Sequence, residues 1–153
     1  MVGDNISLIP NIDALYGFDS WSSDSNFLSI RQQYLDELSH FDFDVPENVI
    51  TDKLPLNFQY IGFILSAFPE AKIVHLKRDA RATCWSIYKC HFKNKGNGFS
   101  YNLDDLTGFY GLYVDLMDFW HQLFPDKIYD ICYEDLTTNQ EKETRKLLEY
   151  CEL

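Results

Sequence analysis

The stretch that decides the fold is residues 72–95, KIVHLKRDARATCWSIYKCHFKNK. Its near-continuous apolar and β-branched start predicts a buried parallel strand, and the residues after Asp79 predict a helix whose free amides Asp79 caps. Seven of the chain's 13 Lys and Arg residues lie here. With the one negative charge of Asp79, the net charge of this stretch is +6. Since the whole chain carries −11, the remaining residues carry −17. This segregation predicts an anion site where the strand meets the helix.

Strands and helices alternate on both sides of this stretch. Residues 49–53 (VITDK) and 127–134 (KIYDICYE) have the composition of strands, and residues 56–68, 103–124 and 140–151 that of helices. The long helix carries a stripe at helical spacing, which predicts its buried face: Leu106, Tyr110, Tyr113, Met117 and Trp120. In the last helix Leu147, Leu148 and Cys151 are expected to face inward. The alternation predicts an α/β domain with a mostly parallel sheet.

Length and composition limit the domain organisation. A chain of 153 residues, 46% of them hydrophobic, is sufficient for one core, so a single domain is expected. Residues 1–48 predict a mostly helical acidic lead-in, and residues 49–153 predict the α/β core. The lead-in has apolar residues at helical spacing: Phe27, Ile30, Tyr34, Leu35 and Leu38.

Composition also narrows the partners and the compartment. No signal peptide or long apolar run is recognisable, so we expect a cytoplasmic protein without membrane contact. The acidic net charge argues against nucleic-acid binding and favours a small anion. The four cysteines form no C-x-x-C pair. His75, Cys84, Cys90 and His91 match no zinc spacing, and no metal is expected.

The strand end supplies the first candidate binding residues. Arg78 follows the strand directly, where parallel sheets bind ligands and a helix N-terminus favours anions. Ser86 lies about two turns further along the helix, and Lys89 lies near the same stripe. Arg and Ser together suit a terminal phosphomonoester. The alternative, that Arg78 pairs with an acidic residue and Ser86 only packs, has similar weight on spacing alone.

Two blocks of the sequence are similar to a known family. Residues 51–88 (TDKLPLNFQYIGFILSAFPEAKIVHLKRDARATCWSIY) and 131–153 (ICYEDLTTNQEKETRKLLEYCEL) resemble the sulfotransferase family, in particular the branch of tyrosylprotein sulfotransferases and bacterial sulfotransferases associated with tetratricopeptide repeats. The resemblance implies a P-loop NTPase-like, three-layer α/β fold with a parallel sheet. It also implies 3′-phosphoadenylyl sulfate as the donor of a sulfuryl group to a hydroxyl or amine acceptor, with adenosine 3′,5′-bisphosphate as the nucleotide product.

The resemblance assigns roles to single positions. Arg78 and Ser86 match the family's ligands for the 3′-phosphate, and Tyr133 of CYEDL matches the residue that contacts adenine. Lys53 of TDKLP matches the lysine that approaches the sulfuryl group. Asp4 of VGDNISLIP is the candidate base for the acceptor proton, with a solvated or capping role as the alternative.

The chain also departs from the family pattern. It lacks a P-R-S-G-T-T-like loop for the 5′-phosphosulfate, and it ends where family members continue into a basic segment. We therefore expect a domain truncated at both ends, with a second copy of the chain as a candidate replacement for the missing first strand. A non-catalytic remnant that binds adenosine 3′,5′-bisphosphate, or a structural or dimerisation domain, are the alternatives to a working enzyme.

Overall fold

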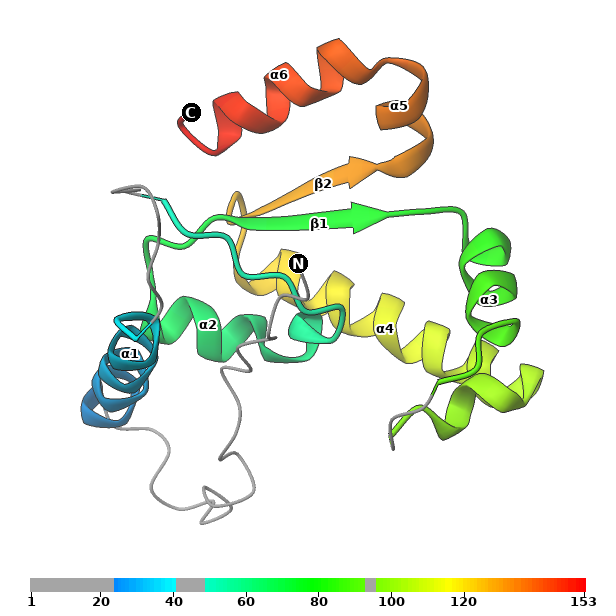
Figure 1. Cartoon of the computed structure of the whole chain (residues 1–153), viewed down its shortest axis with the longest axis horizontal. Helices are drawn as coiled ribbons and strands as arrows, with labels where there is room; N and C mark the ends of the chain where they lie inside the picture. Colours follow the sequence, from blue (N-terminus) through cyan, green and yellow to red (C-terminus); the bar gives the residue numbers. More distant parts are fainter. Residues whose placement is uncertain (1–23, 41–48, 93–95) are drawn as a thin grey trace. The chain divides into compact units, whose positions relative to one another are not determined.

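The computed structural model describes residues 24–40, 49–92 and 96–153 (Figure 1). The chain divides into two units, Met1–Ala71 and Lys72–Leu153, and each is described by itself. No helix within the described residues has the length and apolar character needed to cross a membrane.

The described part of the first unit is helical. Helix α1 covers Asp24–Leu38, a short 3-10 helix (η3) covers Asn57–Tyr60, and α2 covers Ile61–Ala67. Leu38, Ile61 and Leu65 are buried. Arg31 of α1 donates a hydrogen bond to the carbonyl of Ala67 at 3.1 Å, which satisfies an acceptor at the end of α2.

The second unit contains a two-stranded parallel sheet. Strand β1 covers Ile73–Lys77 and β2 covers Ile128–Cys132, and the register pairs Ile73 with Ile128 through to Lys77 with Cys132. Both strands therefore end at the same edge of the sheet. Helix α3 (Ala80–Tyr88) follows β1, and α5 (Tyr133–Thr138) follows β2 without a loop.

Helices cover both faces of this sheet (Figure 1). Helix α4 (Leu103–Leu123), preceded by a 3-10 helix η4 (Gly98–Tyr101), contacts one face, where its Tyr113 bonds His75 of β1. Helix α6 (Gln140–Tyr150) packs on the other face, where the Tyr150 ring stacks on Tyr129 of β2 with centroids 5.0 Å apart. The described part of this unit therefore has three layers, as predicted.

Most of the predicted elements are confirmed. The structure contains the helices expected near residues 27–38, 56–68, 103–124 and 140–151, and the two strands around residues 73–77 and 128–132. Asp79 caps α3 by accepting from the Ala82 amide at 2.9 Å. The predicted stripe of α4 lies inward, with Leu106 and Met117 buried.

Four predictions of local structure were wrong. The strand expected at residues 127–134 ends at Cys132, and Tyr133 and Glu134 belong to helix α5, which was not expected. Residues 49–53 form no strand, because the sheet among the described residues holds β1 and β2 alone and offers this segment no ladder. Strand β1 is only half-buried, since α6 packs on β2 and leaves Val74 and Leu76 exposed on the same face. Leu148 is exposed, and Tyr150 takes the inward position on α6.

The burial of Leu106 predicts a large effect on stability. Leu106 is 1% exposed, so Leu106→Ala should lower the free energy of unfolding, measured by urea denaturation, by about 2–5 kcal/mol. Leu112→Ala on the same helix, at 69% exposure, is the matched control and should change it by less than about 0.5 kcal/mol. Equal effects of the two variants would contradict the assigned buried face of α4.

Candidate functional site

The predicted nucleotide residues Arg78 and Tyr133 lie together at the shared carboxyl edge of the sheet. Arg78 follows β1 and Tyr133 follows β2, and the guanidinium carbon of Arg78 lies 5.0 Å from the centre of the Tyr133 ring. Both residues are exposed. A cation over a ring face at this distance is attracted by the ring and still has N–H groups to offer an anion.

The residues next to this pair also contact each other. The backbone amide of Asp79 donates to Oε1 of Glu134 at 3.1 Å. Asp79 itself caps the amide of Ala82, so two carboxylates stand at the start of α3. These negative charges weaken the attraction of the helix N-terminus for a second anion. A phosphate at this edge would therefore depend on side-chain donors such as Arg78, which contacts the Tyr133 ring.

Ser86 and Lys89 lie further along α3. Ser86 is half-buried and is the seventh residue of the helix, so it lies about 9 Å along the axis from Ala80. Lys89 is the C-cap of α3, at the opposite end from Asp79, and its amine lies 5.5 Å from the Trp85 ring centre. The structure does not bring Lys89 to the Arg78–Tyr133 pair.

The two residues predicted for catalysis lie elsewhere. Lys53 belongs to the first unit, where it is exposed in a segment without regular secondary structure. Asp4 lies outside the described residues. Their predicted roles stay predictions.

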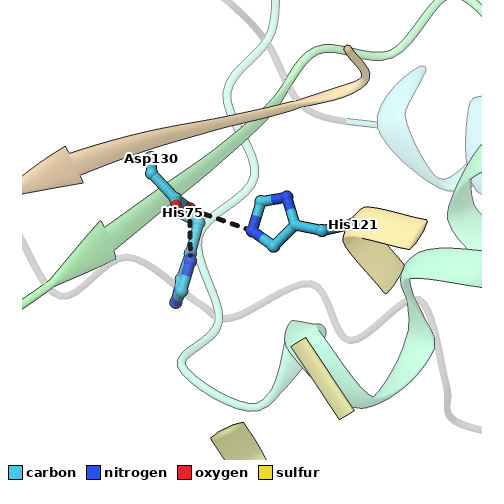
Figure 2. A group of neighbouring side chains, drawn as sticks. All are labelled: His75, His121 and Asp130. Atoms are coloured by element: carbon cyan, nitrogen blue, oxygen red, sulfur yellow. Dashed lines mark hydrogen bonds and ion pairs between the residues drawn. The ribbon is translucent and has the colours of Figure 1, made fainter. Parts of the chain in front are cut away.

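A second group of polar side chains, not predicted as a site, lies between the sheet and α4, and Figure 2 shows three of its members, His75, His121 and Asp130. Asp130 of β2 is paired in register with His75 of β1, and its Oδ1 lies 2.8 Å from Nδ1 of His75. Lys77 donates to the other oxygen, Oδ2, at 2.6 Å. From α4, Nε2 of His121 lies 3.3 Å from Oδ1. We call Asp130 with His75, Lys77, His121 and Tyr113 the Asp130 cluster.

The partners of His75 determine its protonation. An ionised carboxylate can only accept, so Nδ1 carries the hydrogen toward Asp130, and Nε2, 2.6 Å from the Tyr113 hydroxyl, accepts from it. Burial lowers the pKa of His75 and outweighs the opposing effect of Asp130. Burial also raises the pKa of Tyr113 to about 12, which keeps its hydroxyl protonated. His75 is therefore neutral near pH 7.

The carboxylate of Asp130 remains ionised. Burial alone would raise its pKa, but hydrogen bonds from Lys77 and His75 lower the pKa below its usual value. The same contact with Asp130 raises the pKa of Lys77. The Lys77–Asp130 contact is thus an ion pair of opposite full charges.

The Asp130 cluster includes a possible set of metal ligands. His75, His121 and Asp130 present ligand atoms within 4.8 Å of one another, and two imidazoles with a carboxylate suit zinc. However, the ammonium of Lys77 already balances the carboxylate, and a divalent ion on Oδ1 would be repelled by it. The same side chains already form hydrogen bonds with one another, so the geometry favours a hydrogen-bonded network over a metal site.

Sequence patterns contained a weak signal for this cluster. His75 and Lys77 are two positions apart on β1 and so share one face of the strand. Tyr113 and His121 lie eight residues apart on one side of a helix. Asp130 and Glu134 gave no such signal, because their partners depend on the register between β1 and β2. In the sequence His75 stands with Cys84, Cys90 and His91 as the histidines and cysteines of one stretch, whereas the structure groups it with His121 and Asp130.

The second unit is thus a parallel α/β unit with an arginine and a tyrosine at the carboxyl edge of its sheet. The chain belongs to the sulfotransferase family, whose model matches residues 12–153. Membership implies a P-loop-like α/β fold, and the helices and small parallel sheet described above are consistent with it. The family generally uses 3′-phosphoadenylyl sulfate as its donor.

The chain is also similar to one part of a longer bacterial protein. An uncharacterized protein of Aquifex aeolicus (strain VF5) is 41% identical over 127 residues, which are 82% of this chain and 16% of the relative. The chain therefore spans only a small part of the length of that relative. No solved structure matched the chain.

The neutral state of His75 predicts a pH effect on stability. In the unfolded chain His75 binds a proton near its ordinary pKa of 6.5, whereas its pKa in the folded chain is lower. Stability from the neutral ring is therefore present above pH 6.5 and is lost as the pH falls through 6.5 toward the folded-state pKa. Urea denaturation of the unaltered chain should show a steeper loss between roughly pH 7 and pH 5 than His75→Asn shows.

A matched variant separates this effect from the loss of an imidazole elsewhere in the chain. His91 is exposed, so His91→Asn removes an imidazole outside the Asp130 cluster. If stability fell with pH in parallel for the unaltered chain and for His75→Asn, the neutral state assigned to His75 would be contradicted.

Proposed function

We propose that this chain binds 3′-phosphoadenylyl sulfate as part of a sulfotransferase that transfers the sulfuryl group to a hydroxyl or amine acceptor. In this proposal the edge of the sheet around Arg78 and Tyr133 holds the 3′-phosphate and the adenine. The observation that carries it is the contact between these two side chains, which follow the ends of different strands and were expected to serve the same nucleotide.

The chemistry of the edge fits an adenosine 3′-phosphate. Tyr133 is 41% exposed, so part of its ring is accessible for stacking with adenine. Arg78 can give two parallel hydrogen bonds to phosphate oxygens, and Ser86 is the candidate for another. Among the described residues the ion pairs do not include Arg78, so its charge is not matched by a carboxylate.

Lys53 is the proposed residue for the transfer step. Sulfuryl transfer resembles phosphoryl transfer, in which the protein chiefly positions the groups and stabilises negative charge on the departing oxygens. A lysine ammonium can supply that stabilisation. Asp4 is the proposed base for the acceptor proton, because an attacking hydroxyl must lose its hydrogen.

Removal of Arg78 should weaken nucleotide binding. Calorimetric titration with adenosine 3′,5′-bisphosphate should show an affinity about 10- to 100-fold lower for Arg78→Ala, since a charge-assisted contact with phosphate is lost. Arg81→Ala removes the same charge from an exposed position in the first turn of α3 and is the control. Absence of binding by the unaltered chain, or equal affinity after Arg78→Ala, would refute the proposed site.

Lys53 should affect transfer but not binding of the product nucleotide. Lys53→Ala should lower the rate of sulfur-35 transfer from labelled donor to simple phenols and amines by about 100- to 1,000-fold, as for other lost oxyanion donors. Its affinity for adenosine 3′,5′-bisphosphate, which has no sulfuryl group, should change by less than about twofold. The exposed Lys142→Ala is the control. Binding without any transfer by the unaltered chain would instead favour the non-catalytic alternative.

A further inference from the structure

We propose that Asp130 is a positioning residue for the nucleotide site, acting through Lys77 on Arg78. This inference rests on the proposed function, because it assumes that Arg78 meets the 3′-phosphate. Asp130 does not lie at the edge where the nucleotide would bind. It lies within β2, three residues before Tyr133, and contacts the residue that directly precedes Arg78.

The first step concerns the anchor. The Asp130 carboxylate contacts side chains from two other elements, with His75 and Lys77 from β1 and His121 from α4. Its side chain is 29% exposed, so the surrounding solvent screens these contacts only in part. Tyr113 of α4 holds His75 from the other side at 2.6 Å. The carboxylate therefore has a defined position relative to β1, β2 and α4.

The position of Lys77 sets the direction of the Arg78 side chain. Successive side chains of a strand point to opposite faces, so Lys77, when it is held on the α4 face by Asp130, directs the next residue away from that face. Lys77 pairs in register with Cys132, and the next residues along each chain are Arg78 and Tyr133. Arg78 and Tyr133 therefore lie next to each other just beyond the paired residues, and this accounts for the 5.0 Å between the guanidinium carbon and the ring centre. Release of Lys77 would loosen the end of β1 just before Arg78.

A purely structural role for Asp130 predicts a different pattern of effects. If Asp130 only held α4 on the sheet, its loss would weaken all ligands of the edge alike. If it acts through Arg78, its loss should weaken only the ligand that has a 3′-phosphate. Adenosine 3′,5′-bisphosphate and adenosine 5′-monophosphate differ in this one group, so the ratio of their affinities isolates the contacts with the 3′-phosphate, and the Arg78→Ala background separates the part that depends on Arg78.

The test is a double-mutant cycle of Asp130→Asn and Arg78→Ala, measured by calorimetry with both nucleotides. Asp130→Asn should lower the affinity for adenosine 3′,5′-bisphosphate about fivefold and should change that for adenosine 5′-monophosphate by less than about twofold. In the Arg78→Ala background the same change should have almost no effect, because residues that act as one unit are not additive. Asp115→Asn, which removes an exposed carboxylate of α4, is the control.

A second variant guards against general loss of structure. Lys77→Met breaks the proposed link to Arg78 but leaves both histidines on Asp130, and it should reproduce the selective loss. Thermal unfolding would confirm that each variant is folded at the temperature of the titration.

Each outcome decides the question. If the unaltered chain does not prefer the bisphosphate, the proposed function fails and this inference fails with it. If the unaltered chain has that preference and Asp130→Asn keeps it, only the positioning role is wrong. Equal losses for both nucleotides, or a loss that persists without Arg78, would also overturn it.

Discussion

The parallel register of β1 and β2 is the constraint on which the rest of the second unit depends. Every cross-strand pair in the ladder joins residues 55 positions apart, and the same offset relates His75 to Asp130 and Asp79 to Glu134. Arg78 and Tyr133 continue this series one step beyond the ladder. A slip of one residue would turn each side chain of a strand to the other face. It would break the candidate binding pair and the Asp130 cluster together.

The Asp130 cluster gives this register a reason to be unique. A partly buried carboxylate is costly unless donors surround it, and the observed alignment places Asp130 beside both His75 and Lys77, whereas a slip of one residue would turn it to the other face. Apolar neighbours such as Ile128 and Ile131 would tolerate other alignments more easily, because dispersion contacts have little directionality. Two residues of α4 contact the same pair, since Tyr113 bonds His75 and His121 lies beside Asp130. Polar specificity and apolar burial thus act on the same sheet.

Sequence patterns predicted the elements well and their cross-strand contacts poorly. Periodicity identified α4, β1 and β2, and the cap at Asp79 was correct, because these features depend on neighbours within a few residues. The contacts of Asp130 and Glu134 depend on the register, which local composition does not specify. The strand expected at residues 49–53 failed for a related reason, since a strand exists only with a partner. Arg78 was predicted from its place at the strand end and from family resemblance, and Tyr133 from the resemblance alone, whereas their contact needed the structure.

The structure also changes the meaning of the basic stretch at residues 72–95. Two of its described charges have carboxylate partners, because Lys72 pairs with Glu152 and Lys77 pairs with Asp130, each at 2.6 Å. Lys89 lies over Trp85 at the far end of α3. Arg78 differs from these lysines, since an aromatic ring attracts its cation without using the guanidinium hydrogens. Arg78 is therefore the proposed anion-binding residue, and the net charge of the stretch includes lysines that already have carboxylate partners. A compact phosphate monoester, rather than an extended polyanion, matches a single guanidinium at the edge of a two-stranded sheet.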